Sequence, residues 1–105
     1  MAEFTYVARA SRIPPGTAIT IDVDDDLSIA LAHVEGEGFY AIDNICTHDG
    51  GPLGDCDLDD ARIECPRHGA LFDVRTGKAL TLPAILPVNT YAVRVVGDEV
   101  QVELP

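Results

Sequence analysis

CTHDGG at residues 46–51 and CPRHG at residues 65–69 are the two stretches that decide the fold. Each places one cysteine and one histidine in a short segment that contains glycine, and sixteen residues separate the first histidine from the second cysteine. Each segment therefore offers one thiolate and one imidazole, which are both metal donors, from a tight loop. Two such loops that face each other can hold a two-iron cluster or a single tetrahedral ion. The candidate ligands are Cys46, His48, Cys65 and His68.

The composition limits the class of protein. The chain has 105 residues, of which 7 are basic and 18 acidic, with a formal net charge of −11. We expect a single domain over residues 1–105. The acidic excess argues against nucleic acid and anionic lipid as partners, and it favours a soluble partner with a basic docking patch. No apolar run approaches the roughly 18 residues of a membrane span, and the N-terminus has no secretory pattern. We therefore expect a cytoplasmic protein whose three cysteines are thiols or metal ligands.

Short alternating segments between turns predict an all-β protein, with an antiparallel sandwich or barrel as its base. Hairpin signals stand at residues 35–38 and at Gly97-Asp98, and a turn is expected over residues 12–16. No segment shows a helical period over ten or more residues. The expected strands cover residues 4–8, 17–23, 28–34, 39–45, 91–96 and 99–104.

The middle of the chain differs from its flanks. Residues 46–73 are expected to be rich in loops, contain several glycines and have few apolar residues for packing, with short strands expected at 62–65 and 71–74. We expect this region to form a small cluster-binding subdomain, about residues 45–74, inserted into the β base domain. A metal centre would then hold it together.

The two Cys-His stretches resemble those of the Rieske family. The sequences FDVRTGK (72–78), LPA (82–84) and YAVRVVGDEV (91–100) are similar to the small ferredoxins of bacterial aromatic-ring dioxygenase systems. The resemblance implies a Rieske fold and a [2Fe–2S] cluster, with Cys46 and Cys65 on the buried iron and His48 and His68 on the outer iron. It also implies that residues 82–84 form a third loop that shields the cluster.

The same resemblance implies an electron carrier and not an enzyme. Its expected partners are a flavin-containing NAD(P)H reductase and a terminal oxygenase or another acceptor. His48 and His68 would lie at the surface, and the adjacent Asp49, Pro66 and Arg67 would help to form the docking rim.

Differences from the high-potential Rieske proteins of respiratory complexes predict a low reduction potential. Those proteins have an additional cysteine in each loop, where this chain has Gly51 and Arg67, so their disulfide cannot form here. They also have serine and tyrosine hydroxyls where this chain has Ala70 and Phe72. Because hydroxyl donors stabilise the electron-rich reduced centre, their absence predicts a potential near the bottom of the Rieske range, about −150 mV.

Three alternatives remain open at this level. Similar small ferredoxins accompany iron–sulfur assembly machinery, and the small subunit of assimilatory nitrite reductase shares the fold. A structural zinc module could use the same four ligands, although zinc sites usually pair cysteine with cysteine and histidine with histidine.

Several other polar residues are expected to have ordinary roles. Cys56 is expected to be a free thiol, and His33 a half-exposed or hydrogen-bonded strand histidine. Asp55, Asp57 and Asp59 copy the start of a calcium loop, but the glycine and glutamate that such a loop needs are absent, so we expect a solvated acidic loop. The acidic run at 22–26 is expected to be a charged turn.

Overall fold

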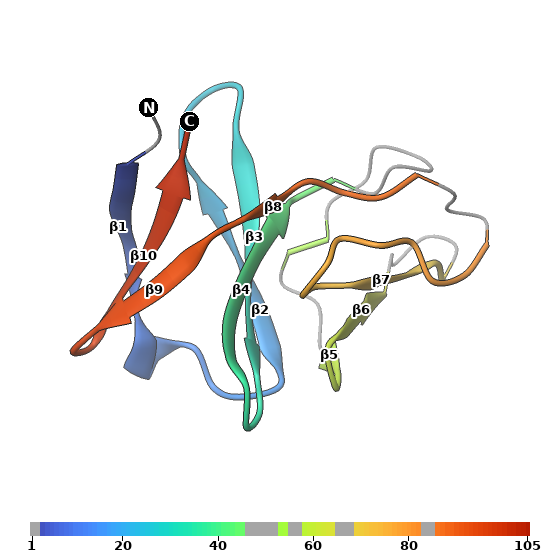
Figure 1. Ribbon diagram of the computed structural model, residues 1–105, viewed down its shortest axis with the longest axis horizontal. Coiled ribbons are helices and arrows are strands. Elements are labelled where there is room, and N and C mark those ends of the chain that lie inside the picture. Colours follow the sequence, from blue (N-terminus) through green and yellow to red (C-terminus); the bar gives the residue numbers. More distant parts are fainter. Residues whose placement is uncertain (1–2, 46–52, 55–57, 65–68, 83–85) are drawn as a thin grey trace.

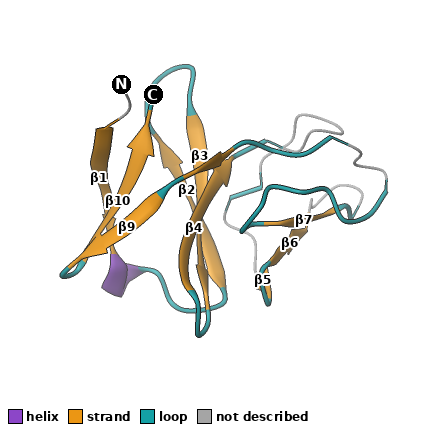
Figure 2. Cartoon of the chain, in the orientation of Figure 1, coloured by secondary structure: helices purple, strands orange, loops and turns teal. Residues whose placement is uncertain are grey.

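The computed structural model describes residues 3–45, 53–54, 58–64, 69–82 and 86–105 (Figure 1). Within these ranges the regular elements are strands, apart from one 3₁₀ helix, η1 (Ala10–Arg12), as Figure 2 shows. All strand pairs are antiparallel, which confirms the predicted all-β class. In the part of the chain described here, no helix has the length and apolar character needed to cross a membrane.

The strands form three sheets. The first has the order β1-β10-β9, and its strands are β1 (Glu3–Arg9), β10 (Glu99–Leu104) and β9 (Val93–Val96). The second has the order β2-β3-β4-β8, with β2 (Thr17–Asp22), β3 (Ser28–Val34), β4 (Gly38–Asp43) and β8 (Thr90–Tyr91). The third has the order β5-β6-β7, with β5 (Leu58–Asp59), β6 (Arg62–Glu64) and β7 (Leu71–Asp73).

The second sheet lies between the other two (Figure 1) and is buried on both faces. On β3, Ile29 and Leu31 face one hydrophobic cluster, which also contains Val100 and Val102 of the first sheet. Ala30 and Ala32 face a second cluster, which contains residues of the third sheet. A strand that is covered on both faces has a continuous apolar sequence instead of an alternating one, and Ile-Ala-Leu-Ala at 29–32 shows this pattern.

The third sheet packs on the second through side chains that are fully buried. Leu53, Ile63 and Phe72 each have 0% exposure and share the second cluster with Ala30, Ala32 and other residues of the second sheet. The expectation that the middle of the chain has few apolar residues to pack with was therefore wrong. This region packs on the second sheet through its own hydrophobic contacts, independently of any stability that a bound metal contributes.

The predicted strands agree with the structure at most positions. Residues 28–34 and 99–104 form strands with the predicted bounds. The strand predicted at 39–45 ends at Asp43, and the one predicted at 91–96 is interrupted at Ala92. Strand β5 was not predicted, and η1 occupies the beginning of the predicted turn at 12–16. The third sheet comes from residues between β4 and β8, where a subdomain was expected; its boundaries near 45 and 74 stay a prediction.

Candidate metal centre

The four candidate ligands, Cys46, His48, Cys65 and His68, lie outside the described residues, but the segments that carry them have described flanks. Asn44 and Ile45 precede the first segment and Leu53 follows it. Glu64 precedes the second segment and Gly69 follows it. The geometry of these flanks shows where each ligand segment begins and ends.

The second ligand segment connects the two strands of a hairpin. Glu64 of β6 lies opposite Leu71 of β7, so the chain leaves and re-enters the sheet at neighbouring positions. Gly69 has a φ of 72°, which glycine adopts without the strain of a side chain. A Cβ at Gly69 would also lie 3.2 Å from Oε1 of Glu64, closer than an ordinary contact. The hairpin therefore fixes both ends of residues 65–68.

The first ligand segment is closed by a side chain instead of a hairpin. The Oδ1 atom of Asn44 accepts hydrogen bonds from the backbone N–H groups of Leu53, at 2.7 Å, and Gly54, at 2.5 Å. The Nδ2 atom of Asn44 donates to Oγ of Ser28 at 3.2 Å and to Oγ1 of Thr20 at 3.4 Å. The residues on either side of 46–52 are thus tied together and to β2 and β3.

The described flanks of both ligand segments belong to one buried core. Leu53 follows the first segment, Ile63 and Ala70 flank the second, and all three belong to the same hydrophobic cluster with Phe72. Ala70 and Phe72 have 0% exposure, and neither has a hydroxyl group that could donate to a metal centre. The architecture therefore places the flanks of both Cys-His segments on the same face of the second sheet.

A third stretch of chain lies beside β7, the strand that follows the second ligand segment in the sequence. The N–H of Leu80 donates to the carbonyl of Leu71 at 2.8 Å, and the N–H of Leu71 donates to Oγ1 of Thr81 at 2.9 Å. Residues 79–81 thus run along β7, as a shielding third loop would require. Leu82 is 77% exposed, while Pro83 and Ala84 of the predicted loop lie outside the described residues.

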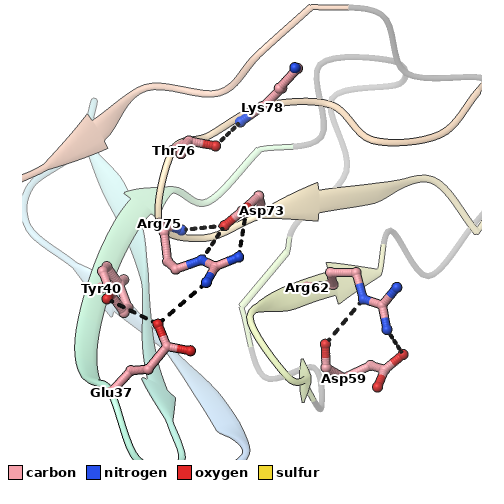
Figure 3. A network of polar contacts seen from close by, with 8 residues as sticks. All are labelled: Glu37, Tyr40, Asp59, Arg62, Asp73, Arg75, Thr76 and Lys78. Carbon is pink, nitrogen blue, oxygen red and sulfur yellow. Dashed lines mark hydrogen bonds and ion pairs between the residues drawn. The ribbon is translucent and has the colours of Figure 1, made fainter.

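A polar network joins the turn after β7 to the tip of the β3–β4 hairpin (Figure 3). The backbone N–H of Arg75 donates to Oδ1 of Asp73 at 2.8 Å, and the guanidinium contacts both carboxylate oxygens at 3.2 Å. The same guanidinium reaches Oε1 of Glu37 at 3.5 Å. Burial raises the pKa of Asp73, but the hydrogen bonds and charge of Arg75 outweigh it, so that the pKa lies below its usual value. Asp73 is therefore held as the carboxylate.

A second polar contact lies next to the first ligand segment, at the end of β4. The hydroxyl of Tyr91 donates to Oδ1 of Asp43 at 2.5 Å, and Nδ2 of Asn89 donates to Oδ2 at 2.9 Å. Partial burial, followed by the hydrogen bond and charge of Asp43, raises the pKa of Tyr91 to about 12. These contacts join β8 to β4 just before Asn44.

The residues expected to have ordinary roles do so where they are described. Nδ1 of His33 donates to the carbonyl of Ile13 at 2.6 Å, and its ring stacks on Phe39 with centroids 4.1 Å apart, which confirms a hydrogen-bonded strand histidine. Oδ1 of Asp24 accepts from the backbone N–H groups of Asp26 and Leu27, both at 2.8 Å, as expected for a charged turn. Asp59 pairs with Arg62 at 2.7 Å (Figure 3). The predictions for Asp49, Asp55, Cys56, Asp57, Pro66 and Arg67 concern residues outside the described ranges.

Sequence reasoning missed Asn44. The available signal was its place at the end of a strand and two residues before Cys46, together with Thr20 and Ser28 as small polar residues in otherwise apolar strands. A side chain that both accepts from backbone amides and donates to hydroxyls suits such a junction.

The residues present fit a cluster bound by both segments. Two thiolates and two imidazoles form the donor set of a Rieske centre, in which histidines replace two cysteines on one iron. The flanks of the two segments share one buried core, so the segments can contribute to one centre.

Comparisons with known proteins agree with this interpretation. Residues 3–92 match the family model of the Rieske [2Fe-2S] domain. The chain is 44% identical to the 3-phenylpropionate/cinnamic acid dioxygenase ferredoxin subunit of Escherichia coli (strain K12), over 95% of this chain and 92% of the relative.

Solved structures show the same likeness. The ferredoxin of carbazole 1,9a-dioxygenase from Nocardioides aromaticivorans IC177 superimposes with a TM-score of 0.84 at 37% identity, covering 95% of this chain and 96% of that one. A chain from a complex of reduced oxygenase and oxidized ferredoxin in carbazole 1,9a-dioxygenase gives a TM-score of 0.88 at 35% identity, covering 95% and 92%. The chain therefore belongs to the Rieske [2Fe–2S] domain family, as an electron-transfer ferredoxin whose cofactor is a [2Fe–2S] cluster.

Proposed function

We propose that this ferredoxin carries single electrons from a flavin-containing NAD(P)H reductase to the terminal oxygenase of an aromatic-ring dioxygenase system. The observation that carries the proposal is that the described flanks of the two Cys-His segments share one buried core, in a chain 44% identical to a dioxygenase ferredoxin subunit. That identity favours a dioxygenase system over iron–sulfur assembly or nitrite reduction. The proposed compartment is the cytoplasm, where NAD(P)H is available.

We propose that four side chains hold the cofactor. Cys46 and Cys65 provide thiolates to the buried iron, and His48 and His68 provide neutral imidazoles to the outer iron. When bound, the cluster supplies a one-electron redox centre. The chain holds it, limits its contact with water and presents it to the partner.

Apolar side chains next to the ligand segments support an oxygenase as partner. Ile45, directly before Cys46, is 47% exposed, and Leu80, Leu82 and Leu86, around the third loop, are 42%, 77% and 64% exposed. Apolar side chains at the centre of an interface exclude water, whereas the net charge of −11 speeds the encounter with a basic patch. We propose that these four residues form the docking surface for the terminal oxygenase.

The buried surroundings support a low potential. Ala70 and Phe72 are fully buried without a hydroxyl, so they cannot stabilise the reduced centre by hydrogen bonding. We propose a midpoint potential near the bottom of the Rieske range, about −150 mV.

Spectroscopy of ligand variants tests the ligand assignment. Wild-type protein purified anaerobically should be reddish-brown and should give the electron paramagnetic resonance (EPR) signal of a Rieske centre after reduction. Cys46→Ser and Cys65→Ser should lose most of the visible absorption. Cys56→Ser is the matched control, since it removes the third thiol and should keep the spectrum. Full visible absorption in Cys46→Ser or Cys65→Ser would refute the ligand assignment, and a colourless wild-type protein that contains zinc would refute the cluster.

Reconstitution tests the proposed electron path. The wild-type ferredoxin should couple oxidation of NADH by a flavoprotein ferredoxin reductase to product formation by a terminal oxygenase related to those of the dioxygenase systems. Leu82→Ser should slow transfer to the oxygenase and leave the visible spectrum unchanged. Equal rates for Leu82→Ser and wild type would contradict the docking surface, whereas failure of the reductase to reduce an intact cluster would contradict the path.

A further inference from the structure

The side chain of Asn44 makes four hydrogen bonds, two as acceptor and two as donor. Its carbonyl oxygen accepts from two backbone N–H groups, and its amide nitrogen donates to two hydroxyls. The orientation of the amide follows from chemistry, because the N–H groups of Leu53 and Gly54 can only donate and so must face its oxygen. The hydroxyls of Ser28 and Thr20 then accept from its nitrogen.

These bonds connect parts of the chain that lie far apart in sequence. Thr20 is on β2, Ser28 is the first residue of β3, and Leu53 and Gly54 follow the first ligand segment. The backbone N–H of Asn44 also donates to the carbonyl of Ser28 at 3.0 Å. Asn44 is therefore fixed to the second sheet by its main chain and holds the far end of residues 46–52 by its side chain.

Packing also places Leu53 in the core and Gly54 against β2. A Cβ at Gly54 would lie 2.0 Å from Oγ1 of Thr20, so the backbone of Gly54 lies directly against β2. Leu53 has 0% exposure and inserts its side chain into the core shared with Phe72. With both amides bound to Asn44, neither is left without an acceptor at this buried junction.

We propose that Asn44 is a positioning residue that closes the first ligand segment and thereby controls how firmly Cys46 and His48 hold the cofactor. The proposal rests on the ligand assignment made above. The second segment is closed by the β6–β7 hairpin, whereas the first has this side chain in the place of a hairpin. Loss of the acceptor should therefore loosen the first segment selectively.

Release of the cluster to a chelator is the primary test. In Asn44→Ala, two buried N–H groups lose their acceptor, and we expect bleaching by an excess of chelator to be about tenfold faster than in wild type or more. Asn44→Asp keeps an acceptor for the two backbone N–H groups, and the hydroxyls of Ser28 and Thr20 can rotate to donate to its second carboxylate oxygen. This variant should therefore keep most of the wild-type lifetime of the cluster in the presence of chelator. Asn89→Ala is the matched control, because Asn89 lies on the exposed side of Asp43 and should release the cluster at the wild-type rate.

Two further measurements separate positioning from a general loss of stability. The EPR g-values of the reduced cluster should change in Asn44→Ala and return towards wild type in Asn44→Asp. Deuterium exchange in the peptide that contains Leu53 and Gly54 should be about tenfold faster in Asn44→Ala, with exchange in β10 unchanged.

The outcomes distinguish this inference from the proposed function. Wild-type release rate and g-values in Asn44→Ala would overturn the positioning role. A wild-type protein without iron would overturn the proposed electron-transfer function, and the exchange at Leu53 and Gly54 would then decide whether Asn44 closes the segment. If Asn44→Ala does not fold, failure of Asn44→Asp to keep the wild-type exchange rate would overturn the inference.

Discussion

Gly54→Ala is a direct test of the packing that supports the first ligand segment. The new Cβ would lie 2.0 Å from Oγ1 of Thr20 and 3.0 Å from its Cα, whereas ordinary contacts begin at 3.4 Å. The hydroxyl would have to move by about 1.4 Å, and Thr20 cannot yield easily because β2 is paired with β3 along its whole length. Overpacking of this kind costs about 2 kcal/mol.

The size of the effect can be checked by thermal unfolding. For a domain of about this length, 1 kcal/mol corresponds to roughly 4 °C, so Gly54→Ala should lower the apparent melting temperature by about 8 °C. Because loss of the cluster makes unfolding irreversible, all variants must be scanned at one rate. Far-ultraviolet circular dichroism reports the sheets, and visible absorption reports the cluster.

A double-mutant cycle isolates the contact with Thr20. Thr20→Ala removes the Oγ1 atom, and the remaining contacts at 3.0 Å then need shifts of only a few tenths of an ångström. The double variant should recover about half or more of the loss caused by Gly54→Ala, so the two changes should be non-additive by about 1 kcal/mol. A melting temperature of Gly54→Ala within 2 °C of wild type, or strictly additive effects, would refute this reasoning.

Three other predictions follow from the core and from the pKa shifts. Phe72→Ala leaves a cavity in the core shared by both ligand segments and should cost about 3–5 kcal/mol, measured as a loss of cluster-loaded protein and of melting temperature. Because the pKa of Asp73 is lower in the folded protein than its value of 3.8 in the unfolded chain, Asp73 stabilises the fold above pH 3.8, and this stability is lost as the pH falls through the folded-state pKa. Arg75→Ala should therefore reduce the loss of melting temperature between pH 6 and pH 3. The raised pKa of Tyr91 contributes stability below pH 10.0 that is lost as pH rises towards about 12, so Tyr91→Phe should reduce the alkaline decline in melting temperature, and an unchanged decline would contradict the contact with Asp43.

The sequence predicted the strand content and the ligand chemistry because both are local. Residues 28–34 and 99–104 have apolar β-branched or alternating patterns that end at turn signals, and they form strands with those bounds. The Cys-His spacing needs no tertiary information to indicate a metal centre. Membership of the Rieske family agrees with the predicted cofactor.

Other features depend on partners that are distant in the sequence. Strand β5 has two residues, too few to give a periodic pattern, and beyond its pairing with β6 the N–H of Leu58 donates to the carbonyl of Gly16 at 3.0 Å. The predicted strand 91–96 is interrupted at Ala92, where the chain passes from the second sheet to the first, and the carbonyl of Ala92 accepts a hydrogen bond from the backbone N–H of Glu103 on β10. Neither partner can be inferred from the strand's own residues.

The packing of the third sheet was underestimated for the same reason. Leu53 and Ile63 are single apolar residues between proline, glycine or charged neighbours, and Phe72 ends an apolar run of three residues, so the segment was expected to have few apolar residues for packing. They become fully buried because Ala30 and Ala32 leave room on the facing side of β3. Asn44 likewise has a role only when Leu53 and Gly54 return to the end of β4.

The midpoint potential of the anaerobically purified protein tests the central claim most directly. The account predicts one reversible one-electron wave near the bottom of the Rieske range, about −150 mV, from a cluster with two histidine ligands and no hydroxyl donor at Ala70 or Phe72. A clearly positive potential would contradict the argument from Ala70 and Phe72. The absence of any wave, together with no visible absorption, would contradict the electron-transfer function.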